Sequence, residues 1–419
     1  MKTKLYFKGP LLTRSGYGEQ SRFALRAIRS RPDLFDVYIQ PLQWGQTSWV
    51  SENDEERRWI DQNVEKTIGY IQQGGTFDAS FQVTIPNEWE KLAPVNIGFT
   101  AGMETTKVAH PWIEKGNEMD RIVVVSNHSK NTYKNTEYAM VNNQTGEQLT
   151  SMLQTEIDVA NYPTKDFGEY EALDLELDYD FNFLCMAQFG PRKNMPNTVK
   201  WFVEEFHDEE IGLVVKSNIA KNCLMDREKL FHDLKGFVNN FPDRKCKVYL
   251  LHGDLDDKEI HSLFENPKIK AFLTLTHGEG FGLPVFEAAY TGIPVISPGW
   301  SGQLDFLVNK STGKSEFYNV EYDLHPIPDH VVWEGVIIKE SMWANPREHS
   351  AKQKMRECFS DLTGAENTEI LEKFKKHANY LHETFSEEKQ NAVMVNSICR
   401  ALGVHPDKKT TDDIVLEFD

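Results

Sequence analysis

The sequence predicts an α/β protein of two domains, each built around a parallel β-sheet. Short apolar runs recur without polar alternation, for example VNIGFT at 95–100 and AFLTLT at 271–276, as expected for strands buried on both faces. Amphipathic helical segments such as VKWFVEEF at 199–206 lie between these runs, and strands that alternate with helices indicate parallel sheets. A chain of 419 residues is also too long for one ordinary hydrophobic core, so two domains are expected.

The predicted strands and helices form two series with a polar break between them. Strands are predicted at 4–7, 95–100, 121–126, 182–187, 211–216, 247–251, 271–276 and 293–297. Helices are predicted at 19–28, 199–206, 257–265, 370–385 and 387–403. Residues 134–180 are polar, irregular and then strongly acidic, so the break is placed there. We therefore expect an N-terminal domain at 1–160, a C-terminal domain at 175–385, and a terminal helix with an acidic tail at 386–419.

The composition limits the class of protein. No apolar run approaches the roughly 18 residues of a membrane span, and the N-terminus is too short and mixed for a signal peptide. The five cysteines are scattered and form no Cys-x-x-Cys pair, which favours reduced thiols in a cytoplasmic protein. The net charge of -18 argues against broad, non-specific binding to nucleic acid or anionic lipid.

A glycine-rich turn between two glutamates carries the strongest chemical signal. It lies within THGEGFGLPVFEAAY at 276–290, where a strand is followed by a loop and then by a helix that opens on a proline. Gly280 and Gly282 allow a ligand to approach the backbone closely, and free N–H groups at a helix start attract an anion such as a phosphate. Glu279 and Glu287 flank this turn, and carboxylates accept hydrogen bonds from the vicinal hydroxyls of sugars. A phosphate between two hydroxyl-bearing sugars indicates a nucleotide sugar.

Four segments together resemble the retaining nucleotide-sugar glycosyltransferases of family 4. They are SGYGEQSR, GMETTKVAHPWIEKGNEMDRIVVVSNHSK, MAQFGPRKNMPNTVKWFVEEF, and the GEGFGLP turn with its Glu-x7-Glu spacing. The resemblance covers most of the chain and implies the GT-B fold, in which two Rossmann-like domains with parallel sheets face a central cleft. It also implies that the nucleotide-sugar donor binds the C-terminal domain and that the acceptor lies mainly on the N-terminal domain.

The resemblance assigns donor contacts to the glycine-rich turn. Glu279 is expected to contact the hydroxyls of the transferred sugar, and Glu287 to contact the nucleotide ribose. The backbone of Phe281, Gly282 and Leu283 is expected to hold the distal phosphate.

Two cations are predicted to bind the diphosphate. Arg192 and Lys193 directly follow a predicted strand, where they can neutralise a diphosphate leaving group. The family more commonly places the lysine several residues beyond the arginine, so Lys216, at the end of another strand, is a candidate to share the role of Lys193. Because the protein supplies this charge, we expect neither a catalytic metal nor a cofactor. The Asp-x-Asp pair at 254–256 is interpreted as the start of a helix.

The N-terminal domain supplies the remaining candidates. Gly16 and Gly18 precede a predicted helix, so their amides are expected to face the diphosphate. A third glycine is absent there, which counts against a dinucleotide-dependent oxidoreductase. Glu104 and His110 follow a predicted strand, and either is a candidate to position the acceptor hydroxyl, with a plain interdomain contact as the alternative. His128 is expected to be a polar loop residue rather than a base.

The sequence therefore predicts a retaining glycosyltransferase that acts on a hydroxyl of a glycan or a lipid-linked sugar. An alternative acceptor is a modified base in DNA, because Arg22, Arg26 and Arg29 lie on one face of a predicted helix, where they suit phosphate contacts. A phosphorylase or epimerase of the same fold is a further alternative. A non-catalytic nucleotide-sugar-binding protein is the alternative from another class.

Overall fold

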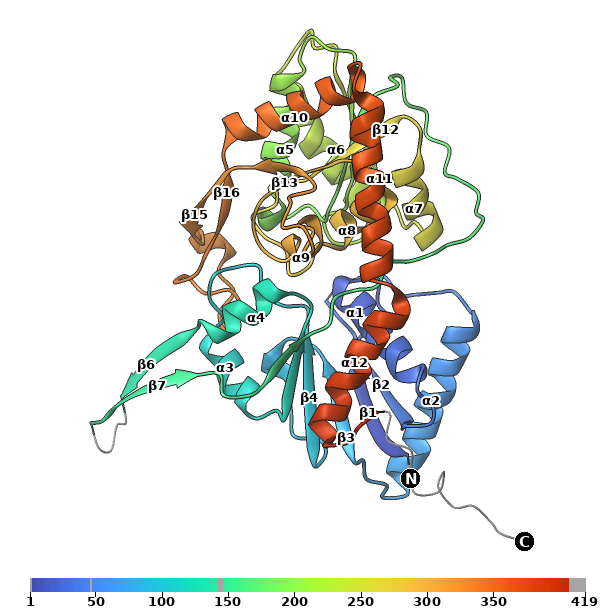
Figure 1. Cartoon of the computed structure of the whole chain (residues 1–419), viewed down its shortest axis with the longest axis vertical. Helices are drawn as coiled ribbons and strands as arrows, with labels where there is room; N and C mark the ends of the chain where they lie inside the picture. Colours follow the sequence, from blue (N-terminus) through green and yellow to red (C-terminus); the bar gives the residue numbers. More distant parts are fainter. Residues whose placement is uncertain (1, 46, 142–145, 407–419) are drawn as a thin grey trace.

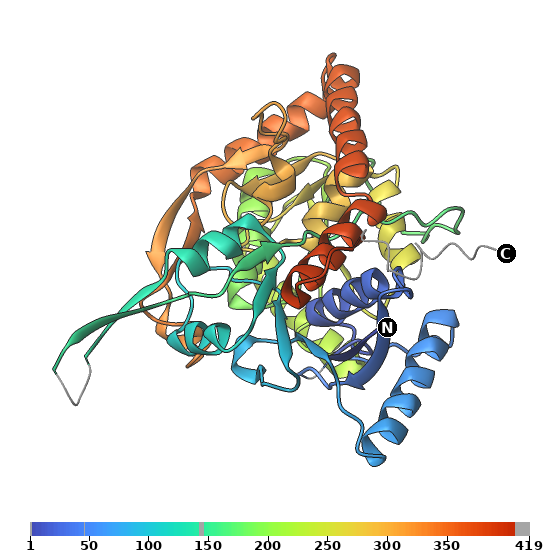
Figure 2. The ribbon, with the colours of Figure 1, turned by 60° about the horizontal axis from the view of Figure 1, so that its bottom comes forward.

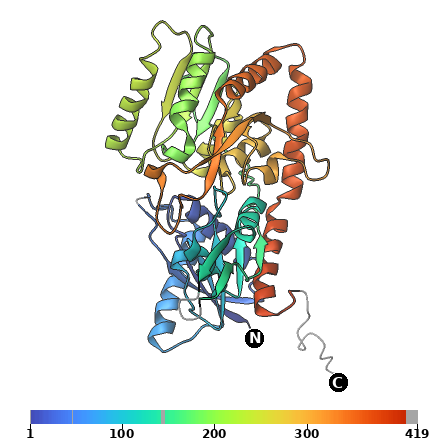
Figure 3. The same cartoon turned by 90° about the vertical axis from the view of Figure 1, so that its left-hand side faces the viewer.

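The computed structural model describes residues 2–45, 47–141 and 146–406, and it confirms two α/β domains, which lie one above the other (Figures 1 and 3). The predicted acidic tail at 410–419 lies outside the described residues. Within the described ranges, no helix has the length and apolar character needed to cross a membrane.

The N-terminal domain contains a six-stranded sheet in the order β2-β1-β3-β4-β5-β8, in which every neighbouring pair is parallel. Its strands are β1 (Thr3–Gly9), β2 (Phe35–Pro41), β3 (Ala79–Val83), β4 (Val95–Thr100), β5 (Arg121–Val124) and β8 (Ile157–Val159). Its helices are α1 (Gly16–Arg29), α2 (Glu55–Gln72), α3 (His110–Asn117) and α4 (Asn127–Lys134).

The C-terminal domain contains a second six-stranded parallel sheet, in the order β11-β10-β9-β12-β13-β14. Its strands are β9 (Asn182–Met186), β10 (Gly212–Lys216), β11 (Lys247–Leu251), β12 (Ile269–Leu273), β13 (Val295–Pro298) and β14 (Tyr318–Val320). The helices around it are α5 (Met195–Glu205), α6 (Leu224–Val238), α7 (Asp257–Glu265), α8 (Leu283–Thr291), α9 (Leu304–Leu307) and α10 (Glu348–Thr363). An antiparallel pair, β15 (Tyr322–Pro326) and β16 (Met342–Pro346), extends this domain.

The strand order places the two most informative loops side by side. In the second sheet the chain moves outward from β9 to β10 and β11, and then returns to pair β12 with the other side of β9. The loops after β9 and β12 therefore leave the same sheet edge in opposite directions, and ligands of such sheets bind at this point. Arg192 and Lys193 follow β9, and Glu279 follows β12.

The last two helices run from one domain to the other. Helix α11 (Asn367–Thr384) lies along the C-terminal domain, and α12 (Glu387–Leu402) packs beside α1 on the N-terminal domain (Figures 1 and 2). Met394 and Ile398 of α12 are fully buried in the same cluster as Phe23 of α1. The predicted terminal helix therefore completes the core of the first domain.

The segment at 134–180 is more ordered than the sequence predicts. It contains an antiparallel hairpin of β6 (Glu137–Val141) and β7 (Gln148–Met152), which extends away from both domains, and then β8 of the first sheet (Figure 2). The hairpin strands were missed because most of their side chains are exposed, so they lack the apolar alternation of a half-buried strand.

Candidate functional site

Four predicted site residues form one charged cluster where the domains face each other. The carboxylate of Glu279 lies 2.5 Å from Lys193 Nζ through Oε1 and 3.2 Å from Arg192 Nη1 through Oε2. Arg192 also reaches Glu104 of the N-terminal domain, with 3.3 Å between Nη2 and Oε1. The cluster thus joins the loops after β9, β12 and β4, and it spans both domains.

The charges of this cluster are strongly coupled. Burial alone would raise the pKa of Glu279, which is 7% exposed, but Lys193 and Arg192 outweigh burial and lower the pKa to about 2. Burial and the adjacent Arg192 lower the pKa of Lys193, and Glu279 opposes this shift. Glu279 is therefore a carboxylate at neutral pH, and it is paired with both cations.

Two glycines of the predicted turn allow the domains to touch. A Cβ on Gly278 would lie 2.3 Å from the carbonyl oxygen of Glu104, and one on Gly280 would lie 2.2 Å from that of Ala101. Gly280 was expected to admit a ligand, but the group it admits in this structure is the backbone of the opposite domain. Any larger residue at either position would push the domains apart.

The start of α8 has the geometry expected of an anion site. Gly282 is its N-cap with φ 94°, a left-handed conformation that favours glycine, and proline occupies the first turn as predicted. The amides of Phe281, Gly282 and Leu283 donate to no acceptor in the part of the chain that the structure describes. These N–H groups remain available to a phosphate.

The loop between β13 and α9, which was not predicted to be part of the site, holds Glu279 in place. The N–H of Glu279 donates to Ser301 Oγ at 2.8 Å, and the N–H of Gly302 donates to the carbonyl of Glu279 at 2.9 Å. Shortly beyond this loop, the buried Asp305 accepts from the N–H of Asn127 of the N-terminal domain at 2.9 Å. The sequence SGQLDF at 301–306 lies shortly after the predicted strand at 293–297, and loops after parallel strands gather at the ligand edge, so a signal was present.

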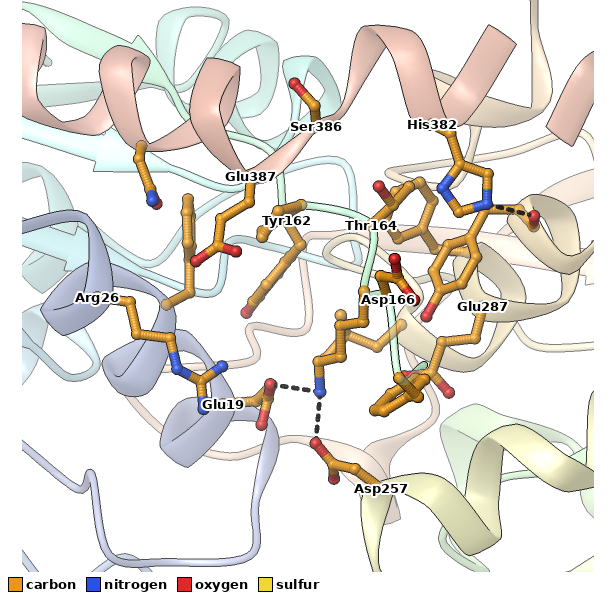
Figure 4. A pocket seen from close by; sticks show the side chains of 18 residues that line it. Glu19, Arg26, Tyr162, Thr164, Asp166, Asp257, Glu287, His382, Ser386 and Glu387 are labelled. Atoms are coloured by element: carbon orange, nitrogen blue, oxygen red, sulfur yellow. Dashed lines mark hydrogen bonds and ion pairs between the residues drawn. The ribbon is translucent and has the colours of Figure 1, made fainter. Parts of the chain in front are cut away.

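Glu287 lies apart from this cluster, in a pocket between the domains of about 470 Å³ (Figure 4). Burial, together with Asp257 and Glu19, raises the pKa of Glu287 to about 7 against the opposing charge of Lys165. Lys165 Nζ lies 2.8 Å from Glu19 Oε1 and 2.9 Å from Asp257 Oδ2. Lys165 was not predicted, because it belongs to the acidic crossing between domains and carries no local motif.

The structure separates the two candidate lysines. Lys193 contacts Glu279, whereas Lys216 Nζ donates to the carbonyl of Gly253 at 2.6 Å in the loop after β11. Burial lowers the pKa of Lys216. Lys216 therefore lies outside the charged cluster.

Gly16 and Gly18 lie in the first turn of α1, where they serve the start of the helix. The amide of Gly18 donates to Ser15 Oγ at 2.9 Å, which is the N-cap bond of the helix. A Cβ on Gly18 would lie 2.0 Å from the carbonyl oxygen of Thr13, so a side chain cannot fit. A Cβ on Gly16 would meet no atom within 4 Å, which leaves the helix start open there.

The arginine stripe on α1 is engaged by the protein. Arg22 donates to two carbonyls of the preceding loop at 2.9 and 3.0 Å. Arg26 binds Glu56 through Nε and Nη2 at 2.7 and 2.8 Å, and Arg29 binds Glu55 at 2.5 Å. Loop carbonyls and glutamates of α2 therefore already bind the three guanidinium groups that were expected to meet phosphates of an acceptor.

The two histidines have separate surroundings. His110 Nε2 lies 3.1 Å from Ser151 Oγ and its ring meets Tyr138 edge-on, both in the β6–β7 hairpin, while Nδ1 lies 3.6 Å from Glu114 of its own helix. His128 is not a loop residue, because it lies in the first turn of α4 and meets Trp300 of the other domain at a ring distance of 4.9 Å. Burial lowers the pKa of His128 to about 4, so the imidazole is neutral at physiological pH.

The second aspartate of the Asp-x-Asp pair caps a helix, as predicted. Asp256 accepts from the N–H of Glu259, whose side chain accepts in return from the N–H of Asp256, and this capping box starts α7. Asp254 accepts from Asn222 Nδ2 at 2.5 Å. Among all described residues, no three His, Cys, Asp or Glu side chains are grouped to hold a metal ion.

Solved structures match nearly the whole chain, although no protein-family model and no curated protein sequence matches it. A glycosyltransferase from Rickettsia africae has a TM-score of 0.57 at 12% identity, over 96% of this chain and 99% of that one. Anabaena HepE, in complex with UDP-glucose, has a TM-score of 0.58 at 10% identity, over 95% and 100%. Sucrose-phosphate synthase from Thermosynechococcus elongatus has a TM-score of 0.57 at 11% identity, over 96% and 100%. The chain therefore has the GT-B fold.

Proposed function

We propose that the protein is a glycosyltransferase that moves a sugar from a nucleoside-diphosphate sugar to an acceptor hydroxyl with retention of configuration. The observation that carries this proposal is the buried carboxylate of Glu279, held between Arg192 and Lys193 at the cleft between the domains. On donor binding the cations turn to the diphosphate, and the carboxylate turns to the sugar hydroxyls. The UDP-glucose complex of the similar Anabaena protein supports a donor of this class.

Each part of the donor has a matching group. The guanidinium of Arg192 suits two phosphate oxygens at once, and Lys193 adds a point charge beside it. The unengaged amides at the start of α8 suit the distal phosphate. Glu287 accepts hydrogen bonds from the ribose hydroxyls. The other carboxylates of its pocket repel phosphate, so the nucleotide is oriented with its diphosphate toward Arg192 and Lys193.

The chemistry requires no covalent intermediate. The bond from the anomeric carbon to the diphosphate oxygen breaks, the acceptor oxygen bonds to that carbon on the same face, and its proton passes to the departing diphosphate. Arg192 and Lys193 stabilise the charge that develops on the leaving group. Glu104 lies 3.3 Å from Arg192 across the cleft, so closure of the two domains aligns the guanidinium of Arg192. Of the two candidates to contact the acceptor hydroxyl, Glu104 is therefore better placed than His110.

The proposed acceptor is a hydroxyl of a glycan or a lipid-linked sugar, and the proposed setting is the cytoplasm. A modified base in DNA is less well supported, because Arg26 and Arg29 are already paired with glutamates. Charge from Arg192 and Lys193 supports a reaction without a metal ion.

The test combines calorimetry with turnover. UDP, GDP and ADP are titrated into the protein, and their glucose conjugates are then followed by nuclear magnetic resonance for slow transfer to water. We expect one nucleotide to bind and its sugar conjugate to release the sugar with retained configuration. Binding without any release points to a non-catalytic nucleotide-sugar-binding protein, and release with inverted configuration contradicts the retaining reaction. Binding of none of the nucleotides contradicts the proposal altogether.

A further inference from the structure

Lys165 bridges the two domains inside the pocket that contains Glu287. It lies on the chain segment that crosses between the domains, and its ammonium contacts Glu19 on α1 and Asp257 at the start of α7. Figure 4 labels these two carboxylates. Its side chain is only 22% exposed. A lysine so enclosed and held by two carboxylates is fixed in position.

The pocket concentrates negative charge around this lysine. Its described lining brings together five carboxyl groups and two cations: Glu19, Asp166, Asp257, Glu287 and Glu387, with Lys165 and Arg26. Arg26 is committed to Glu56, which it binds through two nitrogen atoms. Lys165 therefore supplies the positive charge that the pocket carboxylates share.

Glu287 benefits from Lys165 without being bound by it. Glu287 makes no hydrogen bond or ion pair through its carboxylate within the described chain, whereas Glu19 and Asp257 both contact the ammonium. We propose that Lys165 is a positioning residue for the donor: by engaging two neighbouring carboxylates it favours the charged form of the third, Glu287, and leaves that carboxylate free for the ribose hydroxyls. This inference rests on the proposed function, because it assumes that Glu287 meets a nucleotide.

The surroundings of Glu287 explain why the lysine is required. Burial and the charges of Asp257 and Glu19 favour the protonated form of Glu287, and Lys165 opposes them. A protonated carboxyl turns one acceptor oxygen into a donor, which suits a ribose diol less well. The titratable and charged groups that line the pocket around it are Glu19, Arg26, Lys165, Asp166, Asp257, Tyr162, Tyr290, His382 and Glu387.

The test measures nucleotide affinity against pH in Lys165→Met. The probe is whichever of UDP, GDP and ADP binds the wild-type protein, titrated between pH 5.5 and pH 9. We expect the variant to bind about tenfold more weakly at pH 7, with the pH midpoint of binding moved upward by about one unit, since one unit corresponds to a tenfold change. Lys165→Arg restores the charge and should return both values toward wild type.

Lys352 offers a matched control. Its ammonium also bridges two carboxylates, Glu204 at 2.7 Å and Glu348 at 2.6 Å, and its side chain is likewise 22% exposed, but its partners lie on α5 and α10. Lys352→Met should leave nucleotide affinity and its pH midpoint unchanged. A similar loss of affinity in this control would assign the effect to general destabilisation and overturn the inference.

A second variant keeps the test decisive if Lys165→Met folds poorly. Glu19→Gln removes one competing carboxylate, so it should move the pH midpoint of binding downward. Wild-type affinity and midpoint in Lys165→Met, or an unmoved midpoint in Glu19→Gln, would overturn the inference while leaving the proposed function intact. Failure of the wild-type protein to bind any of the three nucleotides would overturn both.

Discussion

The two glutamates of the Glu-x7-Glu spacing lie in opposite electrostatic surroundings. Glu279 precedes α8 and is held by two cations, which lower its pKa to about 2. Glu287 lies one helical turn inside α8, where burial among other carboxylates raises its pKa to about 7. The same residue type at both ends of one short motif therefore differs in charge near neutral pH: Glu279 is a carboxylate paired with two cations, whereas Glu287 titrates.

Removal of a cation from the first site should have the largest effect. Arg192→Ala should raise the reaction barrier by roughly 2–4 kcal/mol, because it removes a donor to the developing charge of the leaving group. The measurement is kcat for sugar transfer or for donor hydrolysis. A kcat within threefold of the wild-type value would contradict the role of Arg192.

The turn that separates the two glutamates gives the next largest effect. The methyl group of Gly280→Ala would lie 2.2 Å from the carbonyl oxygen of Ala101, which is too close for non-bonded atoms. The two domains should therefore not close fully. We expect kcat/KM to fall on the order of a hundredfold, the cost of a misplacement of about 1 Å. Gly236→Ala is the control, because a Cβ there meets nothing within 4 Å and the position lies within α6. Equal activity of the two variants would show that this close approach is not needed for catalysis.

Glu287→Gln should sharpen the contrast between the two carboxyl groups. Because the pKa of Glu287 is about 7, the wild-type residue is mostly protonated at pH 6 and mostly charged at pH 8. The variant should therefore weaken nucleotide binding about tenfold at pH 8 and little at pH 6, which calorimetry at the two pH values measures. A deficit that is the same at both pH values would place the titrating group elsewhere.

The same variant should also alter stability with pH. Folding raises the pKa of Glu287, so the native state binds an extra proton and wild-type stability falls as the pH rises from about 4.5 toward 7. Glu287→Gln cannot charge and should lose this part of the decline, by about 1 kcal/mol or more. Thermal unfolding at pH 5 and pH 8 measures the difference. A parallel decline in both proteins would contradict the assignment.

The arginine stripe should give the smallest effect. Arg26→Gln breaks a partly exposed pair with Glu56, and such pairs contribute about 0–1 kcal/mol. We expect nucleotide affinity and the salt dependence of transfer to remain as in the wild type. A shallower salt dependence with weaker acceptor binding would instead support an acceptor that carries phosphates, such as DNA.

Much of the fold follows from strands that are buried on both faces. The runs at 95–100 and 211–216 are confirmed as β4 and β10. Strand β3 was missed because Ser80 and Gln82 interrupt its apolar run, and such polar residues are typical of loops. Both side chains are fully buried, and their hydrogen bonds go to Asn96 and Glu90, which no local pattern reveals.

The site residues, too, were predicted where they follow a recognisable strand and missed where they depend on contacts between distant parts of the chain. Arg192 and Lys193 were predicted because they follow a recognisable strand, and Glu279 because the turn after another strand resembles a family motif; strand ends meet at one sheet edge. Lys165 was missed because its position depends on the path of the crossing between the domains. The structural reason for a glycine at position 280 was also missed, because the sequence of one turn does not show that the backbone of the other domain packs against it.

The return of α12 to the N-terminal domain has a consequence for how the chain folds during synthesis. Ribosomes deliver residues in order, and a first domain ordinarily completes its core before the second is made. Here Met394 and Ile398 belong to the core that also contains Phe23, so the chain must emerge as far as Ile398 before that core can close. A nascent chain halted at residue 386 would leave the face of α1 uncovered, exposing apolar surface where chaperones and proteases bind.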